Sequence, residues 1–258
     1  LILGVLKIFN LIHGDLLILG AYISYWAIII LKINPFISLL ITMPTLFVCG
    51  ILIQMGVLRR ILKEEAEPIL ALFGLSLALQ NLYIYLWTAD ARSVPSPFDL
   101  TFYIGNILLP SMKAITFIAS ISIILIIHII LYRTNFGRMV RATAQNKDAA
   151  ELVGINTKVI EIIIFGVSVG LTGLASFFTG VLIPFEPTSG LMLFFRSLAV
   201  VMLAGMGSVS GLVVSGVMLG VVECIGGFIM GGGFKDIFTY GLLLSMLIAK
   251  PKGLFGKY

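Results

Sequence analysis

Charged residues are scarce in this sequence: only 11% of its 258 positions hold Asp, Glu, Lys or Arg. An ordinary soluble domain has about 25%. Hydrophobic residues, by contrast, make up 59% of the chain. So few charged groups cannot cover the surface of a soluble globule of this length, which excludes a soluble enzyme, a disordered chain and a nucleic-acid-binding domain. We therefore expect an all-α membrane protein, a bundle of spanning helices of about 20 apolar residues each.

Cysteine and histidine are also rare, with two of each. Cys49 and Cys224 lie in separate apolar runs, without the spacing of a disulfide framework or a metal site. We interpret them as small buried hydrophobic residues. The two histidines lie far apart in the sequence, whereas an intramembrane enzyme needs a nucleophile with a base, or a set of metal ligands, within reach of one another. We expect neither catalytic residues nor a metal site.

A nucleotide-binding loop is missing as well. No Walker A sequence occurs, and Gly205-x-Gly207 is followed by Ser210 where a dinucleotide fingerprint has its third glycine. We therefore expect this chain to bind no cofactor, so that any ATP used would be bound by a separate partner chain.

Long apolar runs predict eight spanning helices, preceded by the tail of another span in residues 1–12. The chain begins at Leu1 within an apolar run, so we expect this first span to be truncated. Residues 1–31 lack the basic leader and the cleavage site of a signal peptide. The eight predicted spans are 16–31, 36–58, 69–88, 112–132, 159–183, 191–206, 211–230 and 237–249.

Basic residues, which give the chain a net charge of +5, are concentrated in alternate loops. Residues 59–67, 133–158 and the tail from 250 hold 11 of the 17 Lys and Arg residues. Because basic residues gather in cytoplasmic loops, we predict that these segments and the C-terminus are cytoplasmic. The longest loop on the opposite side, 89–111, either contacts an external partner or is only a connector.

The cytoplasmic segment 133–158 has the pattern of a short helix outside the membrane, because it is too amphipathic to span. Asp148 is placed to cap or open a helix at its positive end. Ala149 and Ala150 are small enough for a partner surface to come close, and Gly154 suits the position just after a helix end. We expect a short interfacial helix here; the alternative is a solvated loop with a few caps.

A polar break at residues 10–15 interrupts the apolar N-terminal region, where Asn10, His13 and Asp15 surround Gly14. Broken membrane helices bring polar groups to transport sites. In that interpretation Asp15 meets a substrate ammonium group and a helix N-terminus meets the substrate carboxylate. The alternative is a plain turn between two spans, with His13 and Asp15 facing water or lipid headgroups.

Charged residues inside spans are costly and usually face the bundle interior or a water-filled route. Arg196 and Glu223 lie about 7.5 and 10 Å from the outer ends of consecutive antiparallel spans. We expect an ion pair between them beside the pathway. Alternatively, Arg196 snorkels outward and Glu223 is protonated or bonded to a neighbouring helix. Glu161 is expected to pair with Lys158 at headgroup level.

Glycine is abundant, with 27 residues, and recurs at a spacing of one helical turn. Small residues let membrane helices approach closely, so these glycines are predicted to be helix-packing positions. The pairs are Gly166-xxx-Gly170, Gly207-xxx-Gly211 and Gly216-xxx-Gly220.

These motifs together resemble a known family over nearly the whole chain. Asp148-Ala149-Ala150-x-x-x-Gly154 looks like the coupling motif of ABC importer permeases, with Asp in place of the usual Glu. Further elements are similar to the branched-chain amino acid permeases, and the Asn-x-x-His-Gly-Asp element to the first of their two paired subunits. These elements are Gly137-Arg138-x-x-Arg141-Ala142, Gly154-Ile155-Asn156, Asn10-x-x-His13-Gly14-Asp15 with Gly20-Ala21-Tyr22, Ala204-Gly205-Met206-Gly207-Ser208 with Gly211, Gly216, Gly220 and Glu223, and Pro251-Lys252-Gly253-Leu254-Phe255-Gly256.

The resemblance implies an ABC importer permease fold in one transmembrane domain, 1–258, with a coupling loop at 133–158, in the plasma or inner membrane. An external binding protein would deliver leucine, isoleucine or valine, and a second permease would complete the pathway. Two cytoplasmic ATPases would each press on a coupling helix, here Asp148–Val153 ending at Gly154. Arg138 and Arg141 would lie at the ATPase or lipid-headgroup surface. No covalent chemistry is implied for this chain.

Two other functions fit the same sequence. The first is the same fold importing another small solute, such as urea, short amides or a sugar, because the motifs identify the architecture better than the substrate. A secondary transporter or channel without an ATPase is a different class. Such a protein has little need for the 133–158 helix, and secondary transporters often carry several buried ionisable residues.

Overall fold

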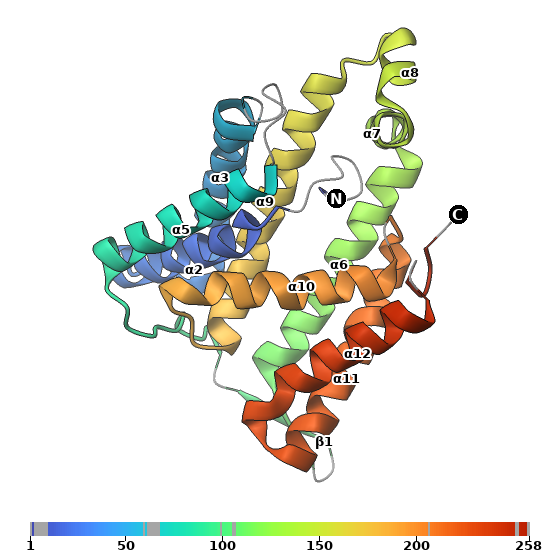
Figure 1. Cartoon of the computed structure of the whole chain (residues 1–258). Coiled ribbons are helices and arrows are strands. Elements are labelled where there is room, and N and C mark those ends of the chain that lie inside the picture. Colours follow the sequence, from blue (N-terminus) through green and yellow to red (C-terminus); the bar gives the residue numbers. More distant parts are fainter. Residues whose placement is uncertain are drawn as a thin grey trace. The chain divides into compact units, whose positions relative to one another are not determined.

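The computed structural model is built almost entirely of helices (Figure 1). It describes residues 2, 10–58, 60, 68–98, 100–104, 107–205, 207–250 and 253–256. Within these residues, eight helices are long and apolar enough to cross a membrane, which confirms the predicted number. They are Ile12–Leu31, Pro35–Leu58, Ile69–Trp87, Ser111–Arg133, Thr157–Leu182, Pro187–Ala204, Gly211–Met230 and Gly232–Ala249.

The predicted span boundaries agree with these helices to within a few residues, and the last span begins earlier than expected, at Gly232. The expected truncated span, 1–12, lies mostly outside the described residues. The elements in chain order are α2 (Ile12–Leu31), α3 (Pro35–Ile53), η1 (Gln54–Leu58), α5 (Pro68–Trp87), β1 (Thr101–Ile104), β2 (Ile107–Pro110), α6 (Ser111–Arg133), α7 (Asn135–Gln145), α8 (Lys147–Leu152), α9 (Thr157–Leu182), η2 (Pro187–Ser189), α10 (Gly190–Ala204), α11 (Val209–Met230), η3 (Gly232–Phe234) and α12 (Lys235–Ala249).

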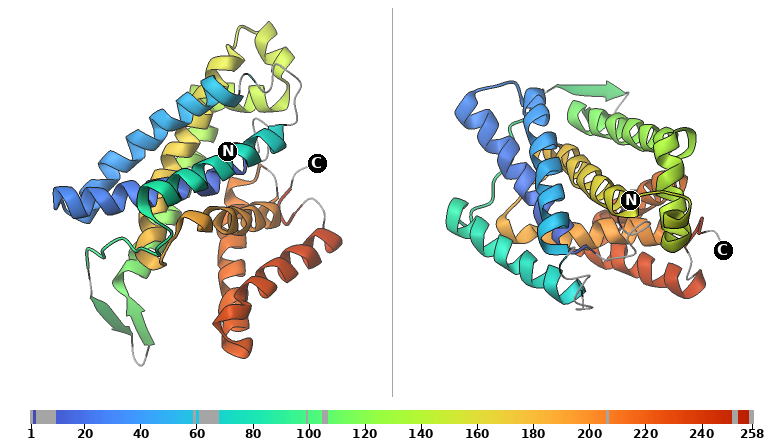
Figure 2. Two further views of the ribbon diagram at one scale, coloured as in Figure 1. Left: turned by 60° about the vertical axis from the view of Figure 1, so that its left-hand side comes forward. Right: turned by 90° about the horizontal axis from the view of Figure 1, so that it is seen from above.

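Residues 89–111 contain a small antiparallel sheet that the sequence analysis did not predict (Figure 2). β1 pairs with β2, and Thr101 lies opposite Pro110. The β-branched and aromatic residues of β1 favour a strand. Phe102 and Tyr103 are exposed. The predicted loop therefore contains a strand pair, while the other elements of the described residues are helices, as the predicted all-α class requires.

The chain divides into two compact units. The first comprises Leu1–Ser120 with Met139–Met192, and the second comprises Ile121–Arg138 with Leu193–Tyr258. Helices α6, α7 and α10 have residues in both units. A single transmembrane domain over 1–258 stays a prediction.

The first unit is organised around α9, whose most extensive packing is against α3 and then α2. Glycines on α9 allow this close approach. A Cβ added at Gly166 would lie 2.9 Å from Ile51 Cγ1, and one added at Gly173 would lie 3.0 Å from Met43 Cα.

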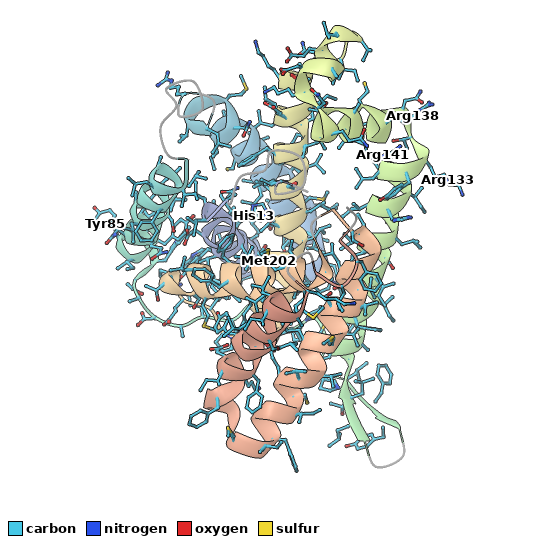
Figure 3. All side chains as sticks on the ribbon, turned by 45° about the vertical axis from the view of Figure 1, so that its right-hand side comes forward. His13, Tyr85, Arg133, Arg138, Arg141 and Met202 are labelled. Atoms are coloured by element: carbon cyan, nitrogen blue, oxygen red, sulfur yellow. The ribbon has the colours of Figure 1, made fainter. Side chains whose placement is uncertain are left out.

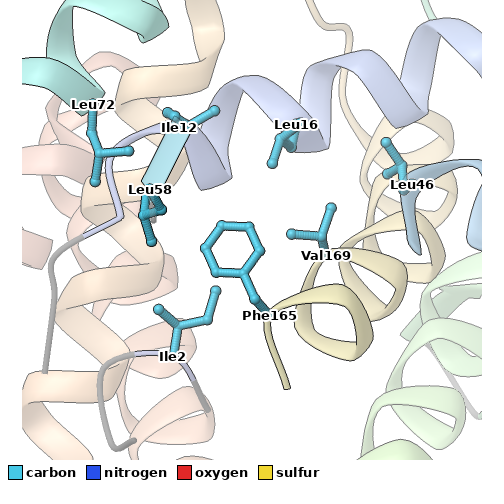
Figure 4. Close-up of a cluster of buried hydrophobic side chains, with 8 residues drawn as sticks. All are labelled: Ile2, Ile12, Leu16, Leu46, Leu58, Leu72, Phe165 and Val169. Atoms are coloured by element: carbon cyan, nitrogen blue, oxygen red, sulfur yellow. The ribbon is translucent and has the colours of Figure 1, made fainter. Parts of the chain in front are cut away.

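Phe165 of α9 is fully buried in the core of the first unit (Figure 4). Apart from Ile2, the surrounding side chains come from α2, α3, η1, α5 and α9, so one cluster joins these helices. They are Ile2, Ile12, Leu16, Leu46, Leu58, Leu72 and Val169.

The second unit contains the paired helices α11 and α12 (Figure 1). Its buried cluster consists of Ala199, Leu203 and Leu219. The chain end returns to α10, where the backbone N–H of Leu254 donates to the carbonyl of Leu203 at 2.9 Å. Gly253 makes this approach possible, because its φ is +79° and an added Cβ would lie 2.5 Å from the Gly205 backbone.

Candidate functional site

Helix α8 occupies the predicted coupling segment and is closed at both ends. Asn146 caps its N-terminus, where the side-chain oxygen accepts from the Ala149 backbone N–H at 3.0 Å. Asp148, predicted to cap or open this helix, does not cap it but lies in its first turn, where its charge interacts favourably with the helix dipole. The predicted start at Asp148 is therefore wrong by one residue, since α8 begins at Lys147.

The C-terminal end of α8 has the hydrogen bonds of a Schellman motif. The Ile155 N–H donates to the Ala150 carbonyl at 3.0 Å, and the Gly154 N–H donates to the Glu151 carbonyl at 3.0 Å. Gly154 has φ +85°, the left-handed conformation that this position requires. The sequence prediction of a helix stop at Gly154 is confirmed, and the alternative of a solvated loop is excluded.

The exposed surface of α8 and of the residue that follows it includes large apolar side chains. Ala150 is buried, whereas Ala149 and Asp148 are exposed. Beyond them, Leu152 is 88% exposed and Val153 is 75% exposed. The end of α8 thus presents two uncovered apolar side chains on a short helix with fixed ends.

Two side-chain contacts attach α8 to α9. Lys147 Nζ lies 2.6 Å from Glu161 Oε1 in an ion pair. The Thr157 hydroxyl donates to Glu151 Oε1. The expected pair of Glu161 with Lys158 is not the one formed: Glu161 pairs with Lys147, because α8 folds back alongside the first turns of α9.

Helix α7 precedes α8, so the segment 133–158 holds two helices where one was expected. Gly137 permits the sharp turn from α6, since an added Cβ would lie 2.3 Å from the Leu131 carbonyl oxygen. Arg138 is exposed and donates to the Asn135 side chain. Arg141 and Ala142, on the same helix, are half-buried. Figure 3 shows Arg138 and Arg141 on α7.

The polar break at residues 10–15 lies inside the protein, at the start of α2. Asp15 is fully buried and accepts hydrogen bonds from the Ser76 hydroxyl and, at 3.0 Å, from Gln80 Nε2. His13 Nε2 lies 2.8 Å from Thr172 Oγ1, and Asn10 is buried beside it. We call this group, with Gly14, the α2 junction.

The burial of the α2 junction contradicts the alternative of a turn with Asp15 facing water or lipid headgroups, because Asp15 has no exposed area. Thr172 lies about 22 Å along α9 from Thr157, given a rise of about 1.5 Å per residue. The start of α2 therefore meets α9 well within its length. Gly190, the first residue of α10, approaches so closely that an added Cβ would lie 2.4 Å from Asp15 Oδ1. A substrate role for the junction stays a prediction.

The expected Arg196–Glu223 ion pair is wrong. Arg196 Nε and Nη2 donate to Asp236 Oδ1 at 3.0 and 2.6 Å. The Thr239 hydroxyl donates to Glu223 Oε1 at 2.6 Å. Both partners lie on α12, so each in-span charge is satisfied by that helix instead of by the other charge.

The other glycines predicted to be helix-packing positions differ in whether neighbouring atoms lie close to them. A Cβ at Gly170 would lie 3.2 Å from Phe47 Cβ, and one at Gly211 would lie 2.9 Å from the Ala204 carbonyl oxygen. Gly216 and Gly220 have no described atom within 4 Å of an added Cβ, so the described chain provides no packing partner there. Gly207 also faces open space and has φ +88°, so it serves the turn between α10 and α11.

The two cysteines are free, Cys49 half-buried and Cys224 exposed. The interpretation of both as buried is therefore wrong for Cys224. Among the described residues, His, Cys, Asp and Glu side chains form no group that could hold a metal ion.

Several residues that bond to the α2 junction or attach α8 to α9 were not predicted from the sequence. Ser76, Gln80 and Thr172 hold the α2 junction, and Glu151 and Lys147 hold α8. Polar residues inside otherwise apolar runs were the available signal for the first three.

The whole length of the chain is similar to permeases of known transport systems. It is 24% identical over 272 residues to the high-affinity branched-chain amino acid transport system permease protein BraD of Pseudomonas aeruginosa, covering 100% of this chain and 89% of BraD. It is 25% identical over 277 residues to the permease proteins LivH of Escherichia coli and Salmonella typhimurium, which carry the same description, with 100% of this chain and 88% of each relative covered. No solved structure matches.

A family model described as the permease component of branched-chain amino acid transport systems matches residues 1–247. Members of this family are transport proteins, and the eight apolar helices of the described residues agree with a multi-pass membrane protein. The chain belongs to the family of permease components of branched-chain amino acid transport systems.

Proposed function

We propose that this chain is a pathway-forming permease subunit of an ATP-driven importer of leucine, isoleucine and valine. Its partners in this proposal are a second permease, two cytoplasmic ATP-binding subunits and an external substrate-binding protein. Family membership over residues 1–247 and the names of BraD and LivH support the substrate class. This chain contributes no chemistry, and ATP is bound by the partner subunits.

The form of α8 is the observation that carries the proposal. Leu152 and Val153 are uncovered apolar side chains beside a helix capped at both ends. Moving such a side chain from water into an apolar groove is worth about 1.5–3 kcal/mol. A helix placed in a groove of a partner is a common recognition mode. An ATP-binding subunit with such a groove would both cover these residues and push on the helix.

The orientation follows from charge. The segments rich in Lys and Arg, including α7 and α8, lie on the cytoplasmic side in this proposal, and so does the C-terminus. The membrane is the plasma or inner membrane. The α2 junction, Arg196 and Glu223 are assigned to the neighbourhood of the pathway.

The test is co-purification followed by transport. The chain is purified in mild detergent from its own membranes, associated subunits are identified, and the complex is reconstituted with its binding protein. We expect ATP-binding subunits and a second permease in the complex, and ATP-dependent uptake of labelled leucine. Uptake of urea or a sugar in place of leucine would contradict the proposed substrate class. Uptake without any ATP-binding subunit would contradict the proposal of an ATP-driven importer.

A variant pair locates the docking site. Leu152→Asp with Val153→Asp is expected to remove the ATP-binding subunits from the complex, because two charges replace the apolar tip. The matched control is Leu100→Asp, a change at another exposed leucine, 63% exposed, in the opposite-side loop. Loss of the ATP-binding subunits in the control as well, or their retention in the α8 variant, would contradict docking at α8.

A further inference from the structure

We infer that the Lys147–Glu161 ion pair and the Glu151–Thr157 hydrogen bond make α8 and α9 one mechanical element, so that a push on α8 displaces α9 along its axis. This inference rests on the proposed function, which supplies the push. It assigns Lys147, Glu151, Thr157 and Glu161 as positioning residues for energy coupling.

The contacts hold α8 at both of its ends. Lys147 is the first residue of this six-residue helix, and Glu151 is the last but one. Their partners, Glu161 and Thr157, lie one turn apart on α9. Two separated attachment points prevent α8 from pivoting about either of them.

These contacts are shielded from solvent on the α9 side. The Glu161 side chain is 16% exposed and Thr157 is 1% exposed, whereas Lys147 is 49% exposed. A partly buried ion pair is screened less by salt than one in open water. The exposed Lys147 side chain can therefore change its conformation while the Glu161 carboxylate stays in place on α9.

The backbone between the two helices has little freedom. The Schellman bonds close α8 at Gly154, and Asn156 caps α9 by accepting from the Val159 N–H at 3.2 Å. The connector consequently ends in hydrogen bonds on both sides. Bending it would break a cap, so motion of α8 is passed on to α9.

Helix α9 carries the displacement across the membrane, since it is one continuous helix of 26 residues, about 39 Å long. Midway it bonds α2 through Thr172 and His13. Near its outer end, the Gly180 carbonyl accepts from the Val94 N–H at 2.8 Å. An axial shift of α9 therefore reaches both the α2 junction and the loop preceding the β1–β2 hairpin.

The experiment compares uptake per ATP hydrolysed in the reconstituted complete complex. Glu161→Gln and Lys147→Gln are each expected to lower this ratio by at least about fivefold, while ATP-binding subunits remain bound. Reversing both charges, Lys147→Glu with Glu161→Lys, is expected to restore it to within about twofold of the unmodified protein. Lys158→Gln is the matched control, a change at an exposed lysine in the first turn of α9 that we expect to leave the ratio unchanged.

A second measurement tests the attachment of α8 to α9 and does not depend on transport activity. Amide hydrogen exchange of Ala149–Val153 is expected to rise about tenfold in Glu161→Gln and to stay unchanged in Lys158→Gln. An unmodified complex that takes up no amino acid would reject the proposed function, and the exchange data would still decide the attachment. Unchanged exchange in Glu161→Gln and Lys147→Gln, or unchanged coupling in both, would overturn the inference.

Discussion

Arg196 and Asp236 form the ion pair that satisfies a guanidinium inside a predicted span. Both Nε and Nη2 donate to the same carboxylate oxygen, and the two side chains are 26% and 39% exposed. A charge at membrane depth is costly unless it is paired or faces water. Because both side chains are partly exposed, the ion pair contributes little to the free energy of unfolding. We therefore expect the protein to fold without it.

A double-mutant cycle measures this pair. We expect Arg196→Gln and Asp236→Asn to be coupled by about 1 kcal/mol in unfolding experiments in mixed micelles, because either change removes the same interaction. Arg196→Gln with Glu223→Gln is the comparison cycle and should show smaller coupling. A larger coupling with Glu223 would favour the pair that the structure does not form.

Gly20 is a position where one methyl group decides packing. An added Cβ would lie 2.3 Å from Ser176 Oγ and 2.8 Å from Leu46 Cδ1. We expect Gly20→Ala to destabilise the protein by about 1–3 kcal/mol through overpacking. The measurement is the unfolding midpoint in detergent.

Gly74 provides the control, because it lies in another spanning helix, α5, with no described atom within 4 Å of an added Cβ. Gly74→Ala is expected to be neutral or to stabilise by up to about 1 kcal/mol. If Gly20→Ala and Gly74→Ala lowered stability equally, the effect of glycine would lie in the helix backbone and not in packing.

At the scale of elements, α8 depends on a single left-handed residue. Six residues are too few to form a stable helix without tertiary support. The Asn146 cap, the Schellman bonds at Gly154 and the attachment to α9 supply that support.

Gly154→Ala tests the helix end. A residue with a Cβ at φ +85° costs about 1–2 kcal/mol, so we expect faster amide exchange in α8 and slower uptake. Gly154→Asn is the matched control, since asparagine tolerates this conformation and should behave nearly as the unmodified protein. Identical behaviour of the two variants would show that the φ of this residue does not limit α8.

Helix α2 shows how a spanning element becomes a junction. Its first turn carries His13 and Asp15, which bond to α9 and α5 respectively. Each bond joins α2 to a different helix, so the polar residues fix the mutual placement of three apolar segments. Unpaired, the same groups would cost free energy in an apolar interior.

At the scale of the whole molecule, the chain consists of two compact units in which the described helices are largely apolar on the outside. Leu125, Phe228 and Ile248 are among many exposed large hydrophobic residues. Such a surface suits lipid and partner subunits rather than water.

Cysteine labelling tests the membrane topology. In a background with Cys49→Ala and Cys224→Ala, a membrane-impermeant maleimide added to intact cells is expected to label Ser96→Cys. Asp148→Cys is expected to react only after permeabilisation, because basic segments stay cytoplasmic. The reverse pattern would invert the proposed orientation, and labelling of both in intact cells would contradict the predicted placement of these loops on opposite sides.

Features that depend on the order of residues along the chain are predictable from the amino-acid sequence. Apolar length predicts the eight spans, and glycine at position 154 predicts the end of α8. Local chemistry decides such features, since a helix end or a span needs only its own residues. Motif order likewise predicts the family, which the match over residues 1–247 shows.

The partners of the buried polar groups, in contrast, depend on how the helices pack in three dimensions. Asp15 bonds Ser76 across 61 positions and His13 bonds Thr172 across 159 positions. Glu161 is three residues from Lys158, yet it pairs with Lys147, because folding of α8 against α9 brings that ammonium group closer. The packing of membrane helices depends on small residues and individual hydrogen bonds, and hydropathy does not record which helices become neighbours.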